Sequence, residues 1–230
     1  MFEVERMSVR TRTTLGRWIR DSRDWLTSVA AVGPDDDRGR RFGSFGAGTC
    51  ITFPQGPSFN EHAIHIGRDT LIGPRVTLTA GMAPDQPLDT DRVITIGDRC
   101  NIGRGSHIVG HRSIVVGDDI TTGPYIYVTD QNHVYADPDV PIARQWPSEE
   151  PVVIGSGCWL GTGCVILPGA NLGRNVVVAA NSVVRGTVPD HSVVAGAPAK
   201  VVRRYEDGRW SPPLRDVPIN PPAGWAAGGD

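Results

Sequence analysis

Residues 154–189 read "IGSGCW LGTGCV ILPGAN LGRNVV VAANSV VRGTVP", consecutive hexapeptides that stay in register without a gap. The first position of each hexapeptide is Ile, Leu or Val, and the fifth is small or β-branched. A period of six matches neither the period of an α-helix nor the simple alternation of a strand. It predicts short strands joined by tight corners and stacked so that the aliphatic residues share one core.

The same period recurs upstream, over residues 66–83, 96–107 and 116–133. Two stretches that lack the period interrupt it, and they are predicted to be surface loops between repeats. They lie around residues 84–95 and 134–153.

Composition limits the classes of protein that the chain can represent. A length of 230 residues, 39% hydrophobic and 21% charged residues are typical of one globular domain with appendages. The net charge of −2 gives no basic field for nucleic acid, and no apolar run could cross a bilayer. The first residues lack the apolar region of a secretory signal. The four cysteines, at positions 50, 100, 158 and 164, lack metal-finger spacing and indicate buried thiols in a reducing, cytoplasmic setting.

Two flanking segments lie outside the repeats. Residues 13–30 predict an amphipathic helix with an apolar face formed by Leu15, Trp18, Ile19, Leu26 and Val29. We expect it to pack against the open base of the stack; binding to a membrane surface is the alternative, but its polar face carries both signs of charge. The tail from Asp207 is rich in Pro and Gly and is predicted to be irregular. The expected organisation is therefore a helical segment 1–44, a repeat domain 45–205 and a tail 206–230.

The repeat resembles that of the left-handed parallel β-helix acyltransferases, which include maltose, galactoside and xenobiotic O-acetyltransferases. The resemblance covers residues 45–205 and implies an all-β fold in which three hexapeptides make one coil. Coils would then begin near residues 66, 96, 116, 154 and 172. Relatives generally form trimers with active sites between subunits, so the resemblance also implies a homotrimer.

A second motif, "VVAGAPAKVVRR" at 193–204, resembles the ending of this family, where basic side chains lie beside the phosphates of coenzyme A. Charge-assisted hydrogen bonds to phosphate suit Lys200, Arg203 and Arg204, although a solvated basic cluster is the simpler alternative. The block "CWLGTG" at 158–163 resembles the part of the family that holds the thioester. The resemblance implies acetyl-CoA as co-substrate, in a channel lined by Trp159, Gly161, Thr162, Ala180 and Arg185.

The segment "TGPYIYVTDQNH" at 122–133 aligns with the family segment that ends in the catalytic histidine, which falls on His133. An imidazole can accept the proton of a hydroxyl as it attacks a thioester, and the amide of Thr162 would stabilise the oxyanion. Asp130 or Asp137 is the candidate to orient the ring. Many relatives have a histidine where this chain has Gln131.

The loop after His133 is the predicted acceptor side of the site. The residues that we expect to meet the acceptor are Asn132, His107, Trp146 and Arg144. No metal is expected, since His107 and His111 more often have structural roles.

The leading hypothesis is a CoA-dependent O-acyltransferase that acts on a sugar or a related small hydroxyl compound. An N-acetyltransferase acting on an amino or nucleotide sugar keeps the same fold. A zinc enzyme similar to the γ-class carbonic anhydrases would use His107, His111 and His133. A catalytically silent binding module is the non-enzymatic alternative, but such a copy would be expected to lose His133 or the basic ending.

Overall fold

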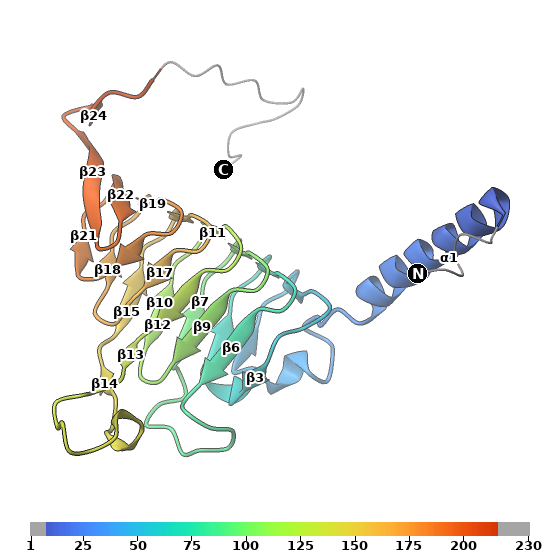
Figure 1. The fold of residues 1–230 in the computed structure, drawn as a ribbon, viewed down its shortest axis with the longest axis horizontal. Helices are drawn as coiled ribbons and strands as arrows, with labels where there is room; N and C mark the ends of the chain where they lie inside the picture. Colours follow the sequence, from blue (N-terminus) through green and yellow to red (C-terminus); the bar gives the residue numbers. More distant parts are fainter. Residues whose placement is uncertain (1–7, 216–230) are drawn as a thin grey trace.

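The structure is a computed structural model, and it describes residues 8–215. The described chain forms three sheets of short parallel strands and one long helix (Figure 1). Sheet B contains β1 (Ser44–Phe45), β4 (Ile64–Ile66), β7 (Ile94–Ile96), β10 (Ile114–Val116), β15 (Val152–Ile154), β18 (Asn171–Leu172) and β21 (Thr187–Val188). Sheet C contains β3 (Ser58–Phe59), β6 (Thr77–Ala80), β9 (His107–Gly110), β12 (Tyr127–Thr129), β17 (Val165–Ile166) and β20 (Val183–Val184).

Sheet A begins with parallel strands and ends in an antiparallel hairpin. Its parallel strands are β2 (Cys50–Ile51), β5 (Leu71–Ile72), β8 (Asn101–Ile102), β11 (Thr121–Thr122), β16 (Trp159–Leu160), β19 (Val177–Val178) and β22 (Ser192–Gly196). The antiparallel strands β23 (Ala199–Glu206) and β24 (Arg209–Ser211) follow. The smaller elements are η2 (Gly39–Arg41), η3 (Glu61–Ala63), η4 (Ile142–Arg144) and the antiparallel pair β13 (Gln131–Asn132) and β14 (Ser148–Glu149).

The chain visits the three sheets in turn, from B to A to C and back to B, so that each circuit is one coil. We name each corner after the two sheets that it joins. The B–A corner comprises residues 67–70, 97–100, 117–120, 155–158 and 173–176, and the A–C corner comprises 73–76, 103–106, 123–126, 161–164 and 179–182. The C–B corner comprises 81–93, 111–113, 130–151 and 167–170.

The predicted coils are present. The expected starts near 66, 96, 116, 154 and 172 coincide with β4, β7, β10, β15 and β18, which are neighbours in sheet B. Both predicted interruptions are loops that emerge at the C–B corner, where Figure 1 shows them side by side. The structure adds one coil that the repeat did not predict, formed by β1, β2 and β3.

Aliphatic side chains fill the interior of the stack. Ile66, Ile96 and Ile154 are each about 1% exposed, and burying such a side chain contributes about 1.5–3 kcal/mol. Cysteines share this core: burial raises the pKa of the Cys164 thiol to about 12. This thiol therefore stays protonated and packs as a small apolar group.

At the B–A corner, side chains link successive coils. Each of them accepts a hydrogen bond from a backbone N–H of the preceding coil. Oδ1 of Asp98 accepts from the N–H of Arg68 at 2.7 Å, and Oδ1 of Asp118 accepts from the N–H of Asp98 at 2.8 Å. The next coil continues the series, because Oγ of Ser156 accepts from the N–H of Asp118 at 3.0 Å. We call this series the amide ladder. Gly97 fits beneath it because a Cβ there would lie 2.3 Å from Oδ1 of Asp118.

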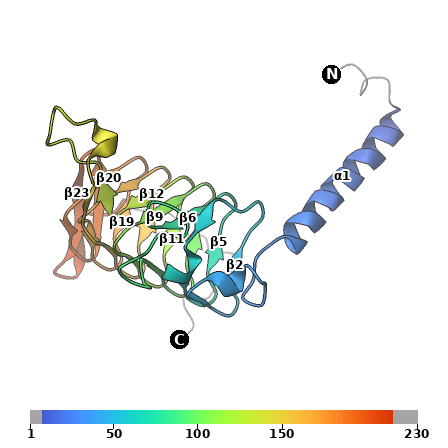
Figure 2. The ribbon, with the colours of Figure 1, turned by 90° about the horizontal axis from the view of Figure 1, so that it is seen from below.

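Ser8 is the N-cap of helix α1 (Val9–Val29), and its Oγ accepts a hydrogen bond from the N–H of Thr11 at 3.2 Å. The expected helix is therefore present and starts four residues earlier than predicted. The prediction that it packs against the base of the stack is wrong. The helix projects away from the sheets (Figures 1 and 2), none of its residues is buried, and Trp18 is 66% exposed.

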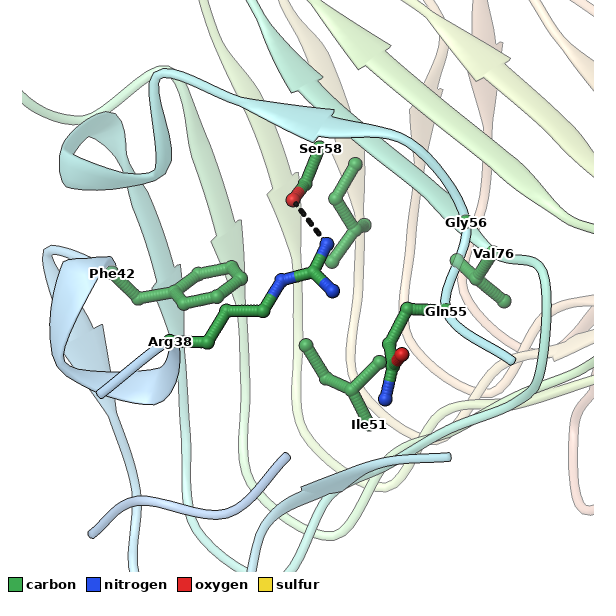
Figure 3. A pocket seen from close by; sticks show the side chains of 8 residues that line it. Arg38, Phe42, Ile51, Gln55, Gly56, Ser58 and Val76 are labelled. Carbon is green, nitrogen blue, oxygen red and sulfur yellow. Dashed lines mark hydrogen bonds between the residues drawn. The ribbon is translucent and has the colours of Figure 1, made fainter. Parts of the chain in front are cut away.

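Residues 31–45 cover the base of the stack instead. Val32 forms an antiparallel bridge with Ile51, and the buried ring of Phe42 packs edge-on against Phe45. Figure 3 shows the Arg38 side chain beside Phe42, with its guanidinium 3.4 Å from Oγ of Ser58. A segment of turns that includes η2, rather than helix α1, therefore covers the base.

The other end of sheet A is closed by the β23–β24 hairpin. The ring of Tyr205 lies 5.5 Å from that of Trp210 and 6.3 Å from that of His191. The expectation of an irregular chain from Asp207 is therefore wrong at β24, while residues 216–230 of that tail lie outside the described residues. Over residues 8–215, no helix has both the length and the apolar character that crossing a bilayer requires.

Candidate active site

At the A–C corner two successive coils lie in close backbone contact. A Cβ on Gly161 would lie 2.5 Å from the backbone nitrogen of Ala180, so only glycine allows this approach. The carbonyl of Thr162 accepts the N–H of Asn181 at 2.9 Å. The N–H groups of Thr162 and Ala180 themselves donate to no residue between 8 and 215, and both residues are exposed. The corner thus presents two donors to a ligand.

Two predicted cofactor residues, Trp159 and Arg203, lie on a line of aligned strand positions between this corner and the C-terminal hairpin. Strand register aligns Trp159 with Val177, Val177 with Val193, and Val193 with Arg203 on sheet A. Trp159 is 54% exposed, so its ring lies on the outer face of the sheet. With neighbouring strands about 4.8 Å apart, Trp159 and Arg203 are separated by roughly 14 Å.

The basic ending forms part of strand β23. Lys200 is exposed opposite Ala195, and the guanidinium of Arg204 lies 2.9 Å from the carboxylate of Glu206. The Nε atoms of Arg203 and Arg204 are buried and have no hydrogen-bond partner among the described residues. Both Nε atoms are shielded from contact with a ligand, so the positive charges of this strand and the exposed Lys200, rather than these atoms, suit an anionic ligand.

Arg185 does not join the other cofactor candidates within one chain. It follows β20 directly, at the C–B end of sheet C, whereas Thr162 and Ala180 lie at the A–C end. The full width of sheet C separates the two positions.

His133 lies directly after β13, at the start of the long loop of the C–B corner. It is exposed, and its ring forms no hydrogen bond with any residue of the described chain. Asn132 is likewise exposed and lies opposite Ser148 in the β13–β14 pair. The predicted base is thus accessible to a ligand, and the protein itself does not orient its ring.

Asp130 has a different role from the one predicted. Its side chain is fully buried and accepts the backbone N–H groups of His111, Arg112 and Ser113 at 2.6–2.8 Å. Both carboxylate oxygens are therefore committed to the turn at 111–113 rather than to the imidazole of His133. The other candidate, Asp137, accepts the N–H of Asp139 at 3.0 Å within the loop.

His107 lies at the start of β9, with its ring 6.4 Å from that of Tyr127. His111 lies beyond the end of the same strand, so an extended rise of about 3.3 Å per residue separates the two by roughly 13 Å. In a zinc site the ligating nitrogens lie only a few ångströms apart, so both side chains would have to lean toward each other from these backbone positions. No cluster of three metal-binding side chains occurs in the part of the chain that the structure describes.

The two loops of the C–B corner enclose a cleft. One hollow of about 500 Å³ is lined by Asp89, Thr90, Arg92, His111, Arg112, Ser113 and Glu149. An adjoining hollow of about 220 Å³ shares Asp89, His111 and Glu149 and adds Gln86, Pro87, Leu88 and Trp146. We call the two together the corner cleft. Their size suits a small organic ligand, and Trp146, a predicted acceptor residue, is 70% exposed at its wall.

The cleft contains residues that the sequence did not identify as functional. Nδ1 of His111 lies 3.2 Å from Oε1 of Glu149; the sequence suggests His111 only as a zinc ligand and does not single out Glu149. The sequence did hold one signal: both loops interrupt the repeat at the same phase, so both had to emerge at the same corner. The predicted acceptor residue Arg144 ends η4 in the longer loop and is exposed.

Two stretches of the chain match known family models. Residues 151–186 match the bacterial transferase hexapeptide, and residues 93–129 match the hexapeptide repeat of succinyl-transferase. Both stretches lie within the parallel coils. The repeat in this chain is therefore the one found in bacterial hexapeptide transferases.

Curated relatives carry names of the same kind. An Escherichia coli protein named lipopolysaccharide biosynthesis O-acetyl transferase WbbJ is 36% identical over 49% of this chain and 61% of its own length. A Mycobacterium tuberculosis protein named as an acetyltransferase is 34% identical over 62% of this chain and 45% of its own length. A galactoside O-acetyltransferase of Lactococcus lactis is 33% identical over 44% of this chain and 47% of its own length. The chain thus spans about half the length of the curated relatives that it matches.

A solved structure shares the fold. AntD, an N-acyltransferase from Bacillus cereus in complex with dTDP and 3-hydroxybutyryl-CoA, superposes with a TM-score of 0.61. The superposition covers 74% of this chain and 86% of that chain at 20% identity. At this identity the likeness extends to the fold alone.

Proposed function

We propose that this hexapeptide-repeat chain, which its repeats and its relatives ally with the acetyltransferases, transfers an acetyl group from acetyl-CoA to a hydroxyl of a sugar or related small acceptor. The observation that carries this proposal is the arrangement along sheet A. Free amides at Thr162 and Ala180, the exposed ring of Trp159 and the basic strand β23 follow one another along its edge. A ligand with a polar thioester end and a phosphate end separated by an extended linker fits this order.

In this proposal the basic strand holds the phosphates of the co-substrate. Lys200 and Arg203 lie on β23, and each can donate charge-assisted hydrogen bonds to phosphate oxygens. Trp159 would line the pantetheine portion between this strand and the corner.

His133 acts as the general base in the proposed reaction. Its ring removes the proton of the acceptor hydroxyl as the oxygen attacks the thioester carbonyl carbon. The amide of Thr162 donates to the carbonyl oxygen as negative charge develops there. When the tetrahedral intermediate collapses, the carbon–sulfur bond breaks, the acetyl ester remains on the acceptor, and the thiolate takes the proton back from the imidazolium.

A second copy of the chain is needed to complete this site. His133 lies at the C–B corner, whereas Thr162 lies at the A–C corner, at the opposite edge of sheet C. We infer a homotrimer in which the C–B corner of one subunit faces the A–C corner of its neighbour, and coils that wind left-handed as in the acyltransferases that the sequence resembles. The same arrangement would bring Arg185 of one chain towards the edge of sheet A at which another chain would bind acetyl-CoA. Four free cysteines and the use of a CoA thioester support a cytoplasmic setting.

The second candidate function is N-acylation of an amino sugar. The likeness to AntD motivates it, since that protein is an N-acyltransferase in complex with dTDP. The rest of the proposed site is unchanged, because an amine must also lose a proton when it attacks a thioester. A panel that pairs sugars with their amino analogues decides between the two acceptors.

Calorimetric titration with acetyl-CoA tests the donor. We expect binding to the wild-type protein and an affinity at least about tenfold weaker in Lys200→Ala/Arg203→Ala, because charge-assisted hydrogen bonds are lost. Arg17→Ala on the projecting helix α1 removes a surface charge and should leave the affinity unchanged. Absence of binding to the wild-type protein would overturn the proposal.

Turnover with the best acceptor tests the base and the assembly. His133→Ala should lower kcat by about 10²–10⁴ and leave acetyl-CoA affinity intact. Co-assembling His133→Ala chains with Lys200→Ala/Arg203→Ala chains should restore part of the activity, because some interfaces would pair two intact halves. Undiminished turnover in His133→Ala contradicts the assigned base, and mixed assemblies that stay inactive contradict the shared site.

A further inference from the structure

His111 and Glu149 form a pair whose geometry is fixed from both sides. The His111 side chain is only 6% exposed, and its Nδ1 lies 3.2 Å from Oε1 of Glu149, which is 27% exposed. The backbone N–H of His111 donates to the buried carboxylate of Asp130 at 2.8 Å. Glu149 is held separately, because β14 pairs it with Gln131 of β13. The pair is therefore part of the framework rather than a chance surface contact.

This contact determines which imidazole nitrogen is available to a ligand. In the neutral imidazole, a carboxylate beside Nδ1 favours the tautomer that carries the proton there, which leaves the lone pair on Nε2. Nε2 of His111 has no hydrogen-bond partner among residues 8–215, and His111 lines both hollows of the corner cleft. The cleft thus contains an oriented hydrogen-bond acceptor that lacks a partner.

His65 and His133 differ from His111 in burial and in the partners of their ring nitrogens. His65 is buried but uses both nitrogens, at 3.2 Å from Oγ of Ser44 and 2.8 Å from the carbonyl of Asp91. His133 is exposed, and no described residue orients its ring. His111 combines burial, a carboxylate on one nitrogen and a cleft beside it.

The chemistry of the cleft wall indicates the class of ligand. Asp89, Arg92 and Arg112 supply charged acceptors and donors of both signs, and none of the three forms an ion pair within the described residues. The exposed Trp146 adds a flat apolar surface at one side. Closely spaced hydroxyl groups can both donate and accept hydrogen bonds, and the C–H face of a sugar ring can pack on indole. This mixture suits an uncharged sugar ring better than a nucleotide or an apolar molecule.

We propose that the corner cleft binds the sugar acceptor and that Nε2 of His111, oriented by Glu149, accepts a hydrogen bond from one of its hydroxyl groups. His111 is in this view an acceptor-binding residue, distinct from the base His133. Its backbone lies in the coil before the one that carries Gln131, the position where many relatives have a histidine. The inference rests on the proposed acetyl transfer only for its kinetic test, since sugar binding can be observed directly.

The direct test follows the histidine side-chain nitrogens of uniformly ¹⁵N-labelled protein by NMR. Spectra of the full chain are recorded with and without galactose, glucose, mannose and N-acetylglucosamine at tens of millimolar, and His111→Asn identifies the signals. We expect a protonated Nδ1 and an unprotonated Nε2 for His111, and a shift of its Nε2 signal by at least one sugar. The inference is overturned if His111 has the opposite tautomer, or if no sugar in the panel shifts its signals.

The kinetic test uses the sugar that turns over best. His111→Ala and Trp146→Ala should each raise KM for the sugar by about tenfold, the cost of one lost contact, with acetyl-CoA affinity unchanged. Glu149→Gln should raise KM less, because an amide can still contact the ring but no longer fixes its tautomer. His62→Ala, at the exposed position of η3, is the matched control that should change nothing.

Separate outcomes identify which proposal fails. An unchanged KM for the sugar in His111→Ala overturns this inference and leaves acetyl transfer intact. Sugar-dependent NMR shifts at His111 without any acetyl transfer support the inference while the proposed function fails. A loss of kcat rather than a rise of KM in His111→Ala would make it a second proton carrier, contrary to the binding role assigned here.

Discussion

At the B–A corner every complete coil from β4 to β19 turns within four residues, whereas at the C–B corner the turns run over 81–93, 111–113, 130–151 and 167–170. The amide ladder, which includes Asp98 and Asp118, connects successive coils at the uniform B–A corner. The variable corner carries the exposed His133, the His111–Glu149 pair and the cleft. One repeat thus supplies both a framework, where each turn supports the next, and a site, where loops of different length enclose a space.

Replacement of the long loop at the C–B corner should separate activity from stability most clearly. Asn132 lies opposite Ser148 in an antiparallel pair, so residues 133–147 can be replaced by Asn-Gly in a two-residue turn. Sugar acetylation should fall by more than about 10²-fold because His133 and Trp146 are lost. Thermal unfolding should shift by less than about 4 °C, the shift that about 1 kcal/mol causes in a domain of this size.

A collapse of stability in this variant would show that the C–B corner belongs to the framework. The measurement combines calorimetric unfolding with an acetyl-transfer assay on the same preparation. A variant that keeps 133–147 but carries Tyr135→Ala, at an exposed position of the loop, is the matched control.

A core substitution at the uniform corner should cost stability. Ile120 is fully buried at the B–A corner, and Ile120→Ala should lower the free energy of unfolding by about 2–5 kcal/mol. Val140 is 36% exposed in the long loop, and Val140→Ala should change the free energy of unfolding by less than about 0.5 kcal/mol. Urea unfolding measures both, and equal losses at the two sites would erase the distinction between framework and site.

The amide ladder should make stability depend on acidity. Hydrogen bonds from the backbone N–H and then the guanidinium of Arg68 hold the pKa of Asp98 below its ordinary range. A lowered folded-state pKa stabilises the fold above the unfolded value of about 3.9, and the effect is lost as pH falls through the folded value. Asp98→Asn should therefore melt below the wild type at neutral pH, and the gap should narrow in acid.

Asp139→Asn provides the comparison for the acid test. Its carboxylate lies in the long loop and forms no ion pair with another residue of the described range. The melting temperature of this variant should follow that of the wild type at every pH. If the difference in melting temperature between Asp98→Asn and the wild type stays constant as the pH falls, the ladder does not depend on charge.

Removal of helix α1 should have the smallest effect. None of its residues is buried, so a chain that begins at Ala30 should melt within about 1 °C of the full-length protein. The contact from Nε2 of Gln55 to the carbonyl of Ala30 at 2.5 Å is retained in that chain. A larger drop, dependent on protein concentration, would reveal that the helix packs against another copy.

The repeat predicted most of the coils because burial requires an aliphatic residue at each inward position. It missed the first coil for a definite reason: residues 52–57 between β2 and β3 are two longer than the other turns of the A–C corner, which shifts the period. The amphipathic pattern of α1 predicted an apolar face but could not identify what that face contacts. The cofactor residues remain predictions: Trp159, Gly161, Thr162 and Ala180 lie in the repeat, whereas Lys200, Arg203 and Arg204 lie on β23 beyond it.

The corner cleft could not be predicted in the same way. His111 and Glu149 are 38 positions apart, and their contact depends on the β13–β14 hairpin, which interrupts the repeat. The role of Asp130 was misjudged because three backbone amides of the preceding coil compete for its carboxylate. Contacts between neighbouring coils therefore decide the chemistry of this corner, and the period alone does not contain them.

The two ends of sheet A bear on whether another molecule could extend the stack. A stack of parallel strands has, at each end, an edge that matches the next coil in direction, and another molecule could extend it into a fibre. In this chain Val32 pairs antiparallel with β2 at one end, and β23 and β24 run antiparallel beyond β22 at the other. A neighbour that approaches sheet A from either end meets a reversed strand instead of a continuing coil. Within residues 8–215, sheet A therefore offers no parallel edge strand to another molecule at either of its ends.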